Sequence, residues 1–152
     1  MTADAAVEPP VTERPDFLRR IQEMLGIRRF KSEQDLVRLV EQGLSIQTIE
    51  CLRRHGLSDD ETYALLLPRR TLAHRSARRE SLSRDESDRV VRLARIVALS
   101  AHVFGEPDRS WRWLRDAKRQ FHGRSPLQLV ATEAGARLVE ELLYRIDEGM
   151  AA

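Results

Sequence analysis

Residues that cap and end helices divide this sequence into short segments. Ser32, Ser45 and Ser83 each precede a run with apolar residues at helical spacing, and Gly43 and Gly105 close two of those runs. A β-strand would instead show alternating apolar and polar residues, and no segment does so convincingly. These capping and terminating residues therefore predict an all-α fold built mostly of short helices.

The longest expected helix, 84–104, should be central to the core, because Val90, Leu93 and Val97 fall at helical spacing along it. Gly135 lies in the first turn of the last helix, where glycine costs about 1 kcal/mol relative to alanine. Another backbone is therefore expected to approach Gly135 closely. In chain order the expected helices cover 17–25, 33–42, 46–55, 58–66, 68–79, 84–104, 107–118, 126–131 and 133–148.

The composition suits a soluble helical protein with a packed core. The chain has 152 residues, of which 41% are apolar and 33% charged. No apolar run approaches the ~20 residues of a membrane span, and the N-terminus lacks the basic start and apolar middle of a secretion signal. The single cysteine, Cys51, excludes an intrachain disulfide and a cysteine-based zinc site. We therefore expect a cytoplasmic protein without membrane attachment.

The stretch "RRTLAHRSARR", residues 69–79, contains five arginines, one histidine and no acid. It follows the predicted helix 58–66 after a tight turn, which is the outline of a helix-turn-helix whose second helix enters the major groove of DNA. Leu72 would be the buried contact of that helix. A solvated basic face without a partner is the alternative, and the turn lacks the usual glycine. The residues expected to face DNA are Arg69, Arg70, Thr71, His74, Arg75 and Arg78.

Five short motifs follow one another in residues 103–149. They are Phe104-Gly105, Trp113-Leu114, Gly123-Arg124-Ser125-Pro126-Leu127, Thr132-Glu133-Ala134-Gly135 and Asp147-Glu148-Gly149. Their order and spacing resemble the toxin-binding domain of the Xre/MbcA/ParS-like antitoxins. Upstream, the stretch from Gly56 to Ile96 is similar to the Xre-like helix-turn-helix region of the same proteins. The segment 115–122 departs from the family pattern, which often has an asparagine-containing phrase there.

The resemblance implies a partner and an arrangement of domains. Members of this family neutralise a toxin, commonly a RES-domain protein that consumes NAD, and they are typically dimeric. Many also repress their own operon by binding its promoter. We therefore expect a lead-in with a short helix at 1–30, an Xre-like helix-turn-helix region at 31–82, and a toxin-binding domain at 83–152. The alternative is a stand-alone dimeric helix-turn-helix regulator whose C-terminal half only dimerises.

Two tryptophans on the predicted helix 107–118 cannot share one core, because residues two apart on a helix point about 200° from each other. Trp113 belongs to the family pattern and is expected in the core, which leaves Trp111 for a partner surface. Arg124 should project from its turn, and the acidic end of the last helix could enter a basic pocket on the toxin. The residues expected to bind the toxin are Trp111, Arg124, Ser125, Glu148, Gly149 and Met150.

Catalysis finds little support in the sequence. The four histidines show no metal-ligand spacing, and there is no phosphate-binding GxxxxGK loop. Cys51 falls on an apolar helix face, where cysteine usually packs as a small apolar group. A small helical enzyme is therefore the least favoured class, and we expect a binding protein with no catalytic residues, metal or cofactor.

Overall fold

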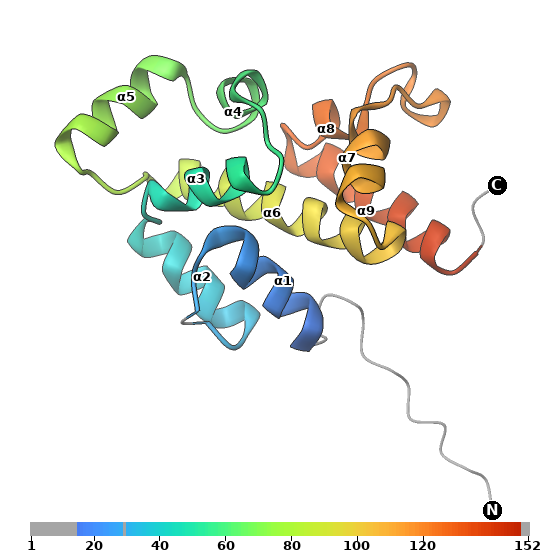
Figure 1. The fold of residues 1–152 in the computed structure, drawn as a ribbon, viewed down its shortest axis with the longest axis horizontal. Helices are drawn as coiled ribbons and strands as arrows, with labels where there is room; N and C mark the ends of the chain where they lie inside the picture. The colour runs from blue at the N-terminus through green and yellow to red at the C-terminus, as the bar shows by residue number, and fades with distance from the viewer. Residues whose placement is uncertain (1–14, 29, 150–152) are drawn as a thin grey trace, which may run out of the picture.

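The computed structural model of the chain describes residues 15–28 and 30–149. All regular structure in these residues is helical, and they contain no strand, which confirms the all-α prediction (Figure 1). The expected lead-in before Pro15 lies outside the described residues. The helices are α1 (Pro15–Leu25), α2 (Glu33–Gln42), α3 (Gln47–Arg54), α4 (Asp59–Leu65), α5 (Arg69–Arg78), α6 (Arg84–Phe104), α7 (Pro107–Arg115), the 3₁₀ helix η2 (Arg119–Phe121), α8 (Pro126–Leu129) and α9 (Glu133–Asp147).

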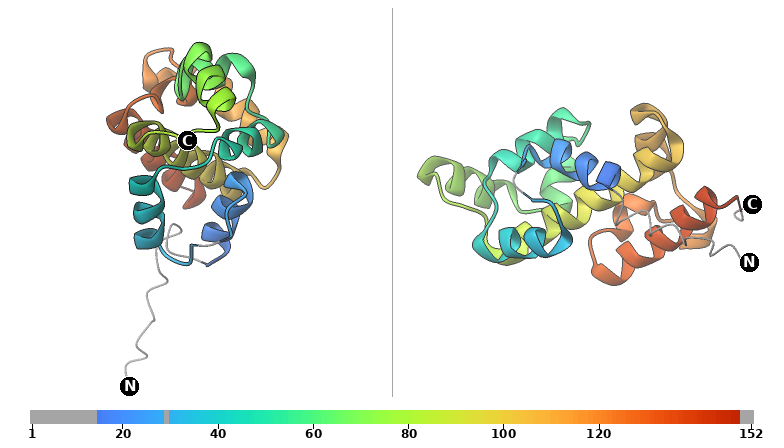
Figure 2. Two further views of the ribbon diagram at one scale, coloured as in Figure 1. Left: turned by 90° about the vertical axis from the view of Figure 1, so that its left-hand side faces the viewer. Right: turned by 90° about the horizontal axis from the view of Figure 1, so that it is seen from below.

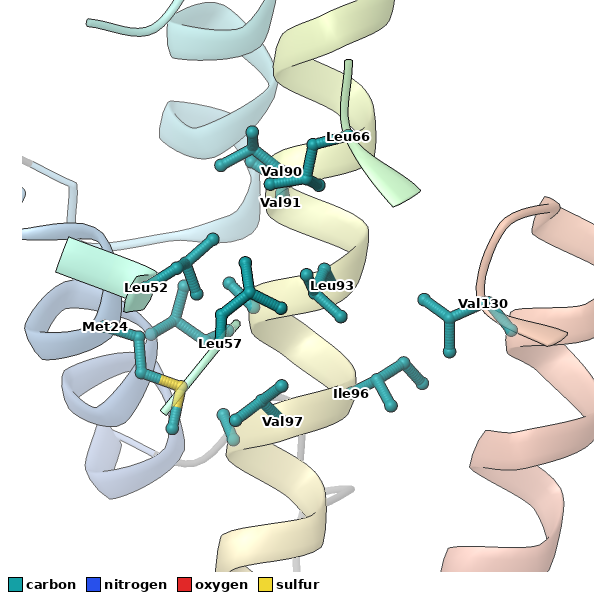
Figure 3. Close-up of a cluster of buried hydrophobic side chains, with 14 of the residues drawn as sticks. Met24, Leu52, Leu57, Leu66, Val90, Val91, Leu93, Ile96, Val97 and Val130 are labelled. Atoms are coloured by element: carbon teal, nitrogen blue, oxygen red, sulfur yellow. The ribbon is translucent and has the colours of Figure 1, made fainter. Parts of the chain in front are cut away.

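Helix α6 is the axis of the molecule. It contacts α1, α2, α3, α7 and α9. Figure 3 shows Met24 and Leu52 on one side of α6 and Val130 on the other, where Ile96 points toward it. Since α6 is buried on several sides, both halves of the chain depend on a single helix for their core. The predicted boundary at Ser83 between domains stays a prediction.

Serine side chains explain where several of the helices begin. Ser58, Ser83 and Ser125 each accept a hydrogen bond from the backbone N–H three residues ahead, and each forms a reciprocal capping box. Ser45 does not cap α3 in this way. That helix begins at Gln47 after Ile46, which is itself in a helical conformation and makes no side-chain cap. The Ser45 hydroxyl instead accepts a hydrogen bond from the Gln47 N–H.

Gly135 packs against the chain that leaves α8. It is buried in the first turn of α9, and a Cβ atom added there would lie 1.9 Å from the carbonyl oxygen of Leu129. This confirms the expected close approach of another backbone. The α8–α9 corner can close this tightly only because position 135 carries no side chain.

The two ends of the molecule carry different elements. Helix α5 lies at one end of the longest axis, while the C-terminal ends of α6 and α9 lie toward the other, near α7 (Figures 1 and 2). None of the helices in the described part of the chain is long and apolar enough to cross a membrane. The basic helix α5 therefore lies far from the C-terminal ends of α6 and α9.

Candidate nucleic-acid and partner interfaces

Helices α4 and α5 form the predicted pair joined by a tight turn. The connection is Leu66, Leu67 and Pro68, and both leucines are buried. Leu72 is also buried, at 7% exposure, which confirms its expected role as the contact of α5 with the body of the protein. The basic helix therefore has a single buried apolar contact with the body of the protein, and most of its other residues are exposed.

Two arginines hold this pair of helices to α6. Arg75 on α5 forms an ion pair with Glu86, with 2.8 Å between its Nε and the Oε2 of Glu86. Arg89 on α6 donates from Nη1 to the backbone oxygen of Leu66, at 3.0 Å. Burial disfavours the Glu86 carboxylate, but the backbone N–H of Ser83 and the guanidinium of Arg75 outweigh it and lower the pKa of Glu86.

Arg75 is therefore not a free basic side chain on the outer face of α5, and its expected contact with DNA stays a prediction. Its side chain is 23% exposed, and besides Glu86 it contacts Glu80 and the backbone oxygen of Ser81. These partners come from the segment between α5 and α6, which folds back because Arg79 ends α5 in a left-handed conformation. Arg75 positions the basic helix; its charge is already neutralised.

Replacing Arg75 by alanine is expected to lower the free energy of unfolding by about 1–3 kcal/mol at pH 7, because a partly buried Glu86 loses its charged partner. Urea denaturation measures the change, and Arg70→Ala, at an exposed position of α5, is the control, expected within about 0.5 kcal/mol of wild type. The lowered pKa of Glu86 stabilises the fold above its ordinary value of 4.5. The difference between variant and wild type should therefore shrink as the pH falls below that value, and a pH-independent difference would contradict this account.

The outer face of α5 carries the remaining predicted DNA residues. Arg70 and His74 are exposed, and so are the two alanines next to them on this face, Ala73 and Ala77. Arg78 is 65% exposed, with its guanidinium 3.9 Å from Glu80. The guanidinium of Arg69 lies 5.8 Å from the ring centre of Tyr63, and Thr71 is half-buried. Short alanine side chains between basic ones would let this helix approach a groove closely.

The predicted burial of the two tryptophans on α7 is reversed. Trp111 is 5% exposed, and its indole Nε1 donates to the backbone oxygen of His55 at 2.7 Å. A Cβ atom on Gly56 would lie 2.4 Å from the same indole nitrogen, so the glycine leaves room for the ring. Trp111 thus joins α7 to the connection between α3 and α4, and it is not available to a partner.

Arg115 completes this junction. Its guanidinium stacks over the Trp111 ring at 4.7 Å and forms an ion pair with Glu61 at 2.8 Å. It also donates to the backbone oxygen of Gly56. Glu61 belongs to the capping box of α4, so α7 is tied directly to the first helix of the α4–α5 pair. No sequence signal pointed to this contact, because Glu61 and Arg115 lie on different helices.

Trp113 is the half-exposed tryptophan. Its ring centre lies 5.4 Å from that of Phe104, at an interplanar angle of 39°. The Nζ atom of Lys118 lies 5.1 Å from the centre of the Trp113 ring. Partial burial disfavours the charged amine and, outweighing the attraction of Asp116, lowers the pKa of Lys118.

The segment after α7 closes into a compact loop. The Lys118 N–H donates to the oxygen of Arg124, and the Lys118 oxygen accepts from Phe121 and Gly123. This loop ends α7 at Arg115, three residues before the predicted end of the helix. Arg124 is exposed, as its turn position indicated. Its role in toxin binding stays a prediction.

The other predicted toxin-binding residues differ in availability. Ser125 is buried, and its hydroxyl accepts from the backbone N–H of Gln128, so its polar group serves the cap of α8. Glu148 and Gly149 follow α9 and are exposed. Met150 lies outside the described residues. Their contacts with a partner stay predictions.

Within residues 15–28 and 30–149, no group of three or more histidine, cysteine or acidic side chains is arranged to hold a metal ion. Cys51 is buried on α3, and its sulfur accepts a hydrogen bond from Arg54.

Both halves of the chain match antitoxin domains. Residues 35–95 match the family model described as the antitoxin Xre-like helix-turn-helix domain, and residues 100–149 match the antitoxin Xre/MbcA/ParS C-terminal toxin-binding domain. A Pseudomonas putida protein named Antitoxin Xre is 34% identical over 134 residues, which cover 88% of this chain and 84% of that relative. A Yersinia enterocolitica protein of the same name is 26% identical over 117 residues, 76% of this chain and 72% of its own.

Proposed function

Because the chain belongs to the Xre family of antitoxins, we propose that it neutralises a RES-type toxin that consumes NAD and represses its own operon by binding the promoter. The observation that carries this proposal is the succession of the two matched domains along one chain, with α6 running through both. The RES class of the toxin rests on the resemblance of the C-terminal motifs. The protein would act in the cytoplasm, by binding and without catalysis.

Promoter binding would use the outer face of α5. Arg70 and His74 point away from the body of the protein in the first turns of the helix, where the second helix of a helix-turn-helix contacts base edges. Arginine can bind guanine with two hydrogen bonds, which gives sequence information. Arg78, further along α5, would contact phosphate and add affinity that falls with salt.

We also infer that the chain forms a homodimer. Helix-turn-helix proteins commonly bind as dimers, with each recognition helix in one half-site of a palindromic operator. One copy of α5 offers few basic side chains once Arg75 is committed to Glu86. Two copies would double these contacts.

Toxin neutralisation is tested by co-expression. The gene that lies beside this one is expressed alone and together with the full chain, and growth is measured. We expect growth arrest by the neighbour alone and recovery with the chain present. Arrest that persists despite soluble, folded antitoxin would overturn the proposal.

Promoter binding is tested with the variant Arg70→Ala/Arg78→Ala, for which we expect 10- to 100-fold weaker affinity for the operon's own promoter, measured by fluorescence anisotropy. Toxin neutralisation should be unchanged. The control is Arg38→Ala/Arg137→Ala, which removes the same charge at two positions that are 71% and 74% exposed. Equal loss of affinity in both variants would indicate a general charge effect and contradict the placement on α5.

A further inference from the structure

An aromatic and basic patch lies where α6 ends and α7 begins. Phe104 and Trp113 stack there, and both side chains are partly exposed. A shallow hollow of about 380 Å³ beside them is lined also by Arg109, Arg112 and Asp116. We call Phe104, Arg109, Arg112, Trp113 and Lys118 the aromatic–basic patch.

The burial of Trp111 forces Trp113 outward. The two side chains point to opposite sides of α7, and Trp111 is fixed by its hydrogen bond to His55. Trp113 cannot turn into the same core, so it lies over Phe104 at the surface. Tryptophan and arginine are the residues most enriched among those that dominate binding energy at protein interfaces. A half-buried tryptophan fixed in place by its own helix loses little freedom on binding.

Basic side chains outnumber acids at the hollow itself, where Arg109 and Arg112 face a single acid, Asp116, and Lys118 lies against Trp113; Glu106 and Asp108 precede them at the start of α7. Residues 109–124 contain six arginines and lysines and a single acid, Asp116. Arg115 is committed to Glu61, but Arg109 and Arg112 are exposed and form no ion pair within the described part of the chain. A partner that covers this patch must offer carboxylates to its rim and apolar surface to its centre.

We propose that the aromatic–basic patch is the surface that holds the toxin, and that the toxin meets it with an apolar hollow rimmed by acidic side chains. This inference rests on the proposed function, whose toxin-binding segment, residues 100–149, contains the whole patch. The patch lies toward the end of the molecule opposite α5 (Figure 1), so one chain can bind the toxin and DNA at the same time.

A protein partner is favoured over nucleic acid by this position. A DNA duplex in contact with the outer face of α5 would lie at the other end of the long axis. The aromatic pair is tilted, at 39° between rings, and sits beside a hollow wide enough for a side chain. Such a surface suits an inserted apolar group better than a run of stacked bases.

The test reverses charge at the patch in the full chain. Arg109→Glu/Arg112→Glu should weaken the affinity for the purified toxin encoded by the adjacent gene at least tenfold, with promoter affinity within twofold of wild type. Arg70→Glu/Arg78→Glu makes the same change in net charge on α5. It should show the opposite result, with weakened promoter binding and unchanged toxin binding. Both affinities are measured at one salt concentration, because screening affects both.

Variants at Trp113 test whether the apolar centre of the patch contributes to toxin binding in addition to its charge. Trp113→Ala should weaken toxin binding at least tenfold, whereas Trp113→Phe should keep affinity within about threefold of wild type, because a second aromatic ring can still lie over Phe104. Circular dichroism and thermal unfolding establish that each variant is folded. The charge-reversal variant, altered only at exposed positions, keeps the proposal testable if Trp113→Ala is unstable.

The outcomes distinguish the two proposals. If wild type binds the toxin and the Arg109→Glu/Arg112→Glu variant binds it equally well, the patch is wrong and the antitoxin function stands. If wild type does not bind the toxin, the proposed function itself fails. Loss of promoter binding in the patch variant would assign the patch to nucleic acid. Loss of self-association in Trp113→Ala, with toxin binding intact, would assign it to a second copy of the chain.

Discussion

Replacing Gly135 by alanine should destabilise the protein by about 3 kcal/mol, the upper end of the usual cost of overpacking. Helix propensity alone predicts the reverse, a gain of about 1 kcal/mol, because Gly135 lies within the first turn of α9. The added methyl group would lie 1.9 Å from the carbonyl oxygen of Leu129. That oxygen belongs to the backbone and accepts from the Thr132 N–H, so it cannot rotate away as a side chain could. The whole α8–α9 corner would have to move.

Urea denaturation of the full chain measures this effect. The control is Ala134→Gly, one residue earlier in the same turn and exposed, which should cost no more than about 1 kcal/mol. The two substitutions exchange the same pair of residues in opposite directions at adjacent sites. A Gly135→Ala variant as stable as wild type would show that the corner can relax, and would refute the steric account.

Truncating Trp111 to alanine is expected to cost about 3–5 kcal/mol, a typical loss for a buried aromatic side chain. The indole is 5% exposed, donates to the His55 oxygen and lies beneath the Arg115 guanidinium. Its removal would leave a cavity between α7 and the α3–α4 connection, and the part-buried His55 carbonyl without its indole donor. The same truncation at half-exposed Trp113 should cost only about 1–2 kcal/mol.

The two alanine variants are compared by denaturant unfolding, followed by circular dichroism because both remove a fluorophore. Trp111→Phe separates packing from hydrogen bonding. It keeps an aromatic ring but leaves the His55 oxygen unpaired, so it should lose about 1–3 kcal/mol. Equal losses at positions 111 and 113 would contradict the burial described for α7.

Much of the fold could be predicted because its helices are delimited by local chemistry. Ser58, Ser83 and Ser125 use their own hydroxyls to satisfy N–H groups three residues away, so a short window of sequence contains the whole cause. Gly135 could be interpreted similarly, since a glycine in a first turn is unfavourable without a close neighbour. The same argument wrongly predicted Ser45 as the cap of α3, because Ile46, which is itself in a helical conformation, lies between Ser45 and the start of the helix at Gln47.

The two tryptophans of α7 show what helical periodicity can and cannot predict. The spacing correctly placed Trp111 and Trp113 on opposite sides of a helix, but it cannot say which side faces the core. The structure shows that Trp111 faces the core, where its indole donates to the backbone oxygen of His55, 56 residues earlier in the chain. A backbone oxygen is present at every residue, so the identity of residue 55 does not reveal this contact. Distance along the chain is the reason this contact left no pattern in the sequence.

The sequence predicted the basic helix of the candidate DNA surface, but not the contacts of every arginine on it. Helix α5 and its buried Leu72 follow from local pattern. Arg75 was expected among the exposed residues of the basic helix, whereas it pairs with Glu86, 11 residues later in the chain and beyond a left-handed turn at Arg79. Partner contacts at Arg124, Glu148 and Gly149 remain predictions.

The clamp of Trp111 and Arg115 on the α3–α4 connection and Glu61 has a geometric consequence. These contacts join α7 directly to α4, and α6 is one continuous helix that contacts α7 and forms the Arg75–Glu86 ion pair with α5. A toxin bound to α7 would therefore be held at a defined distance and orientation from DNA bound to α5. The spacing between neighbouring binding sites on the DNA would then determine whether two bound toxin molecules fit side by side or clash.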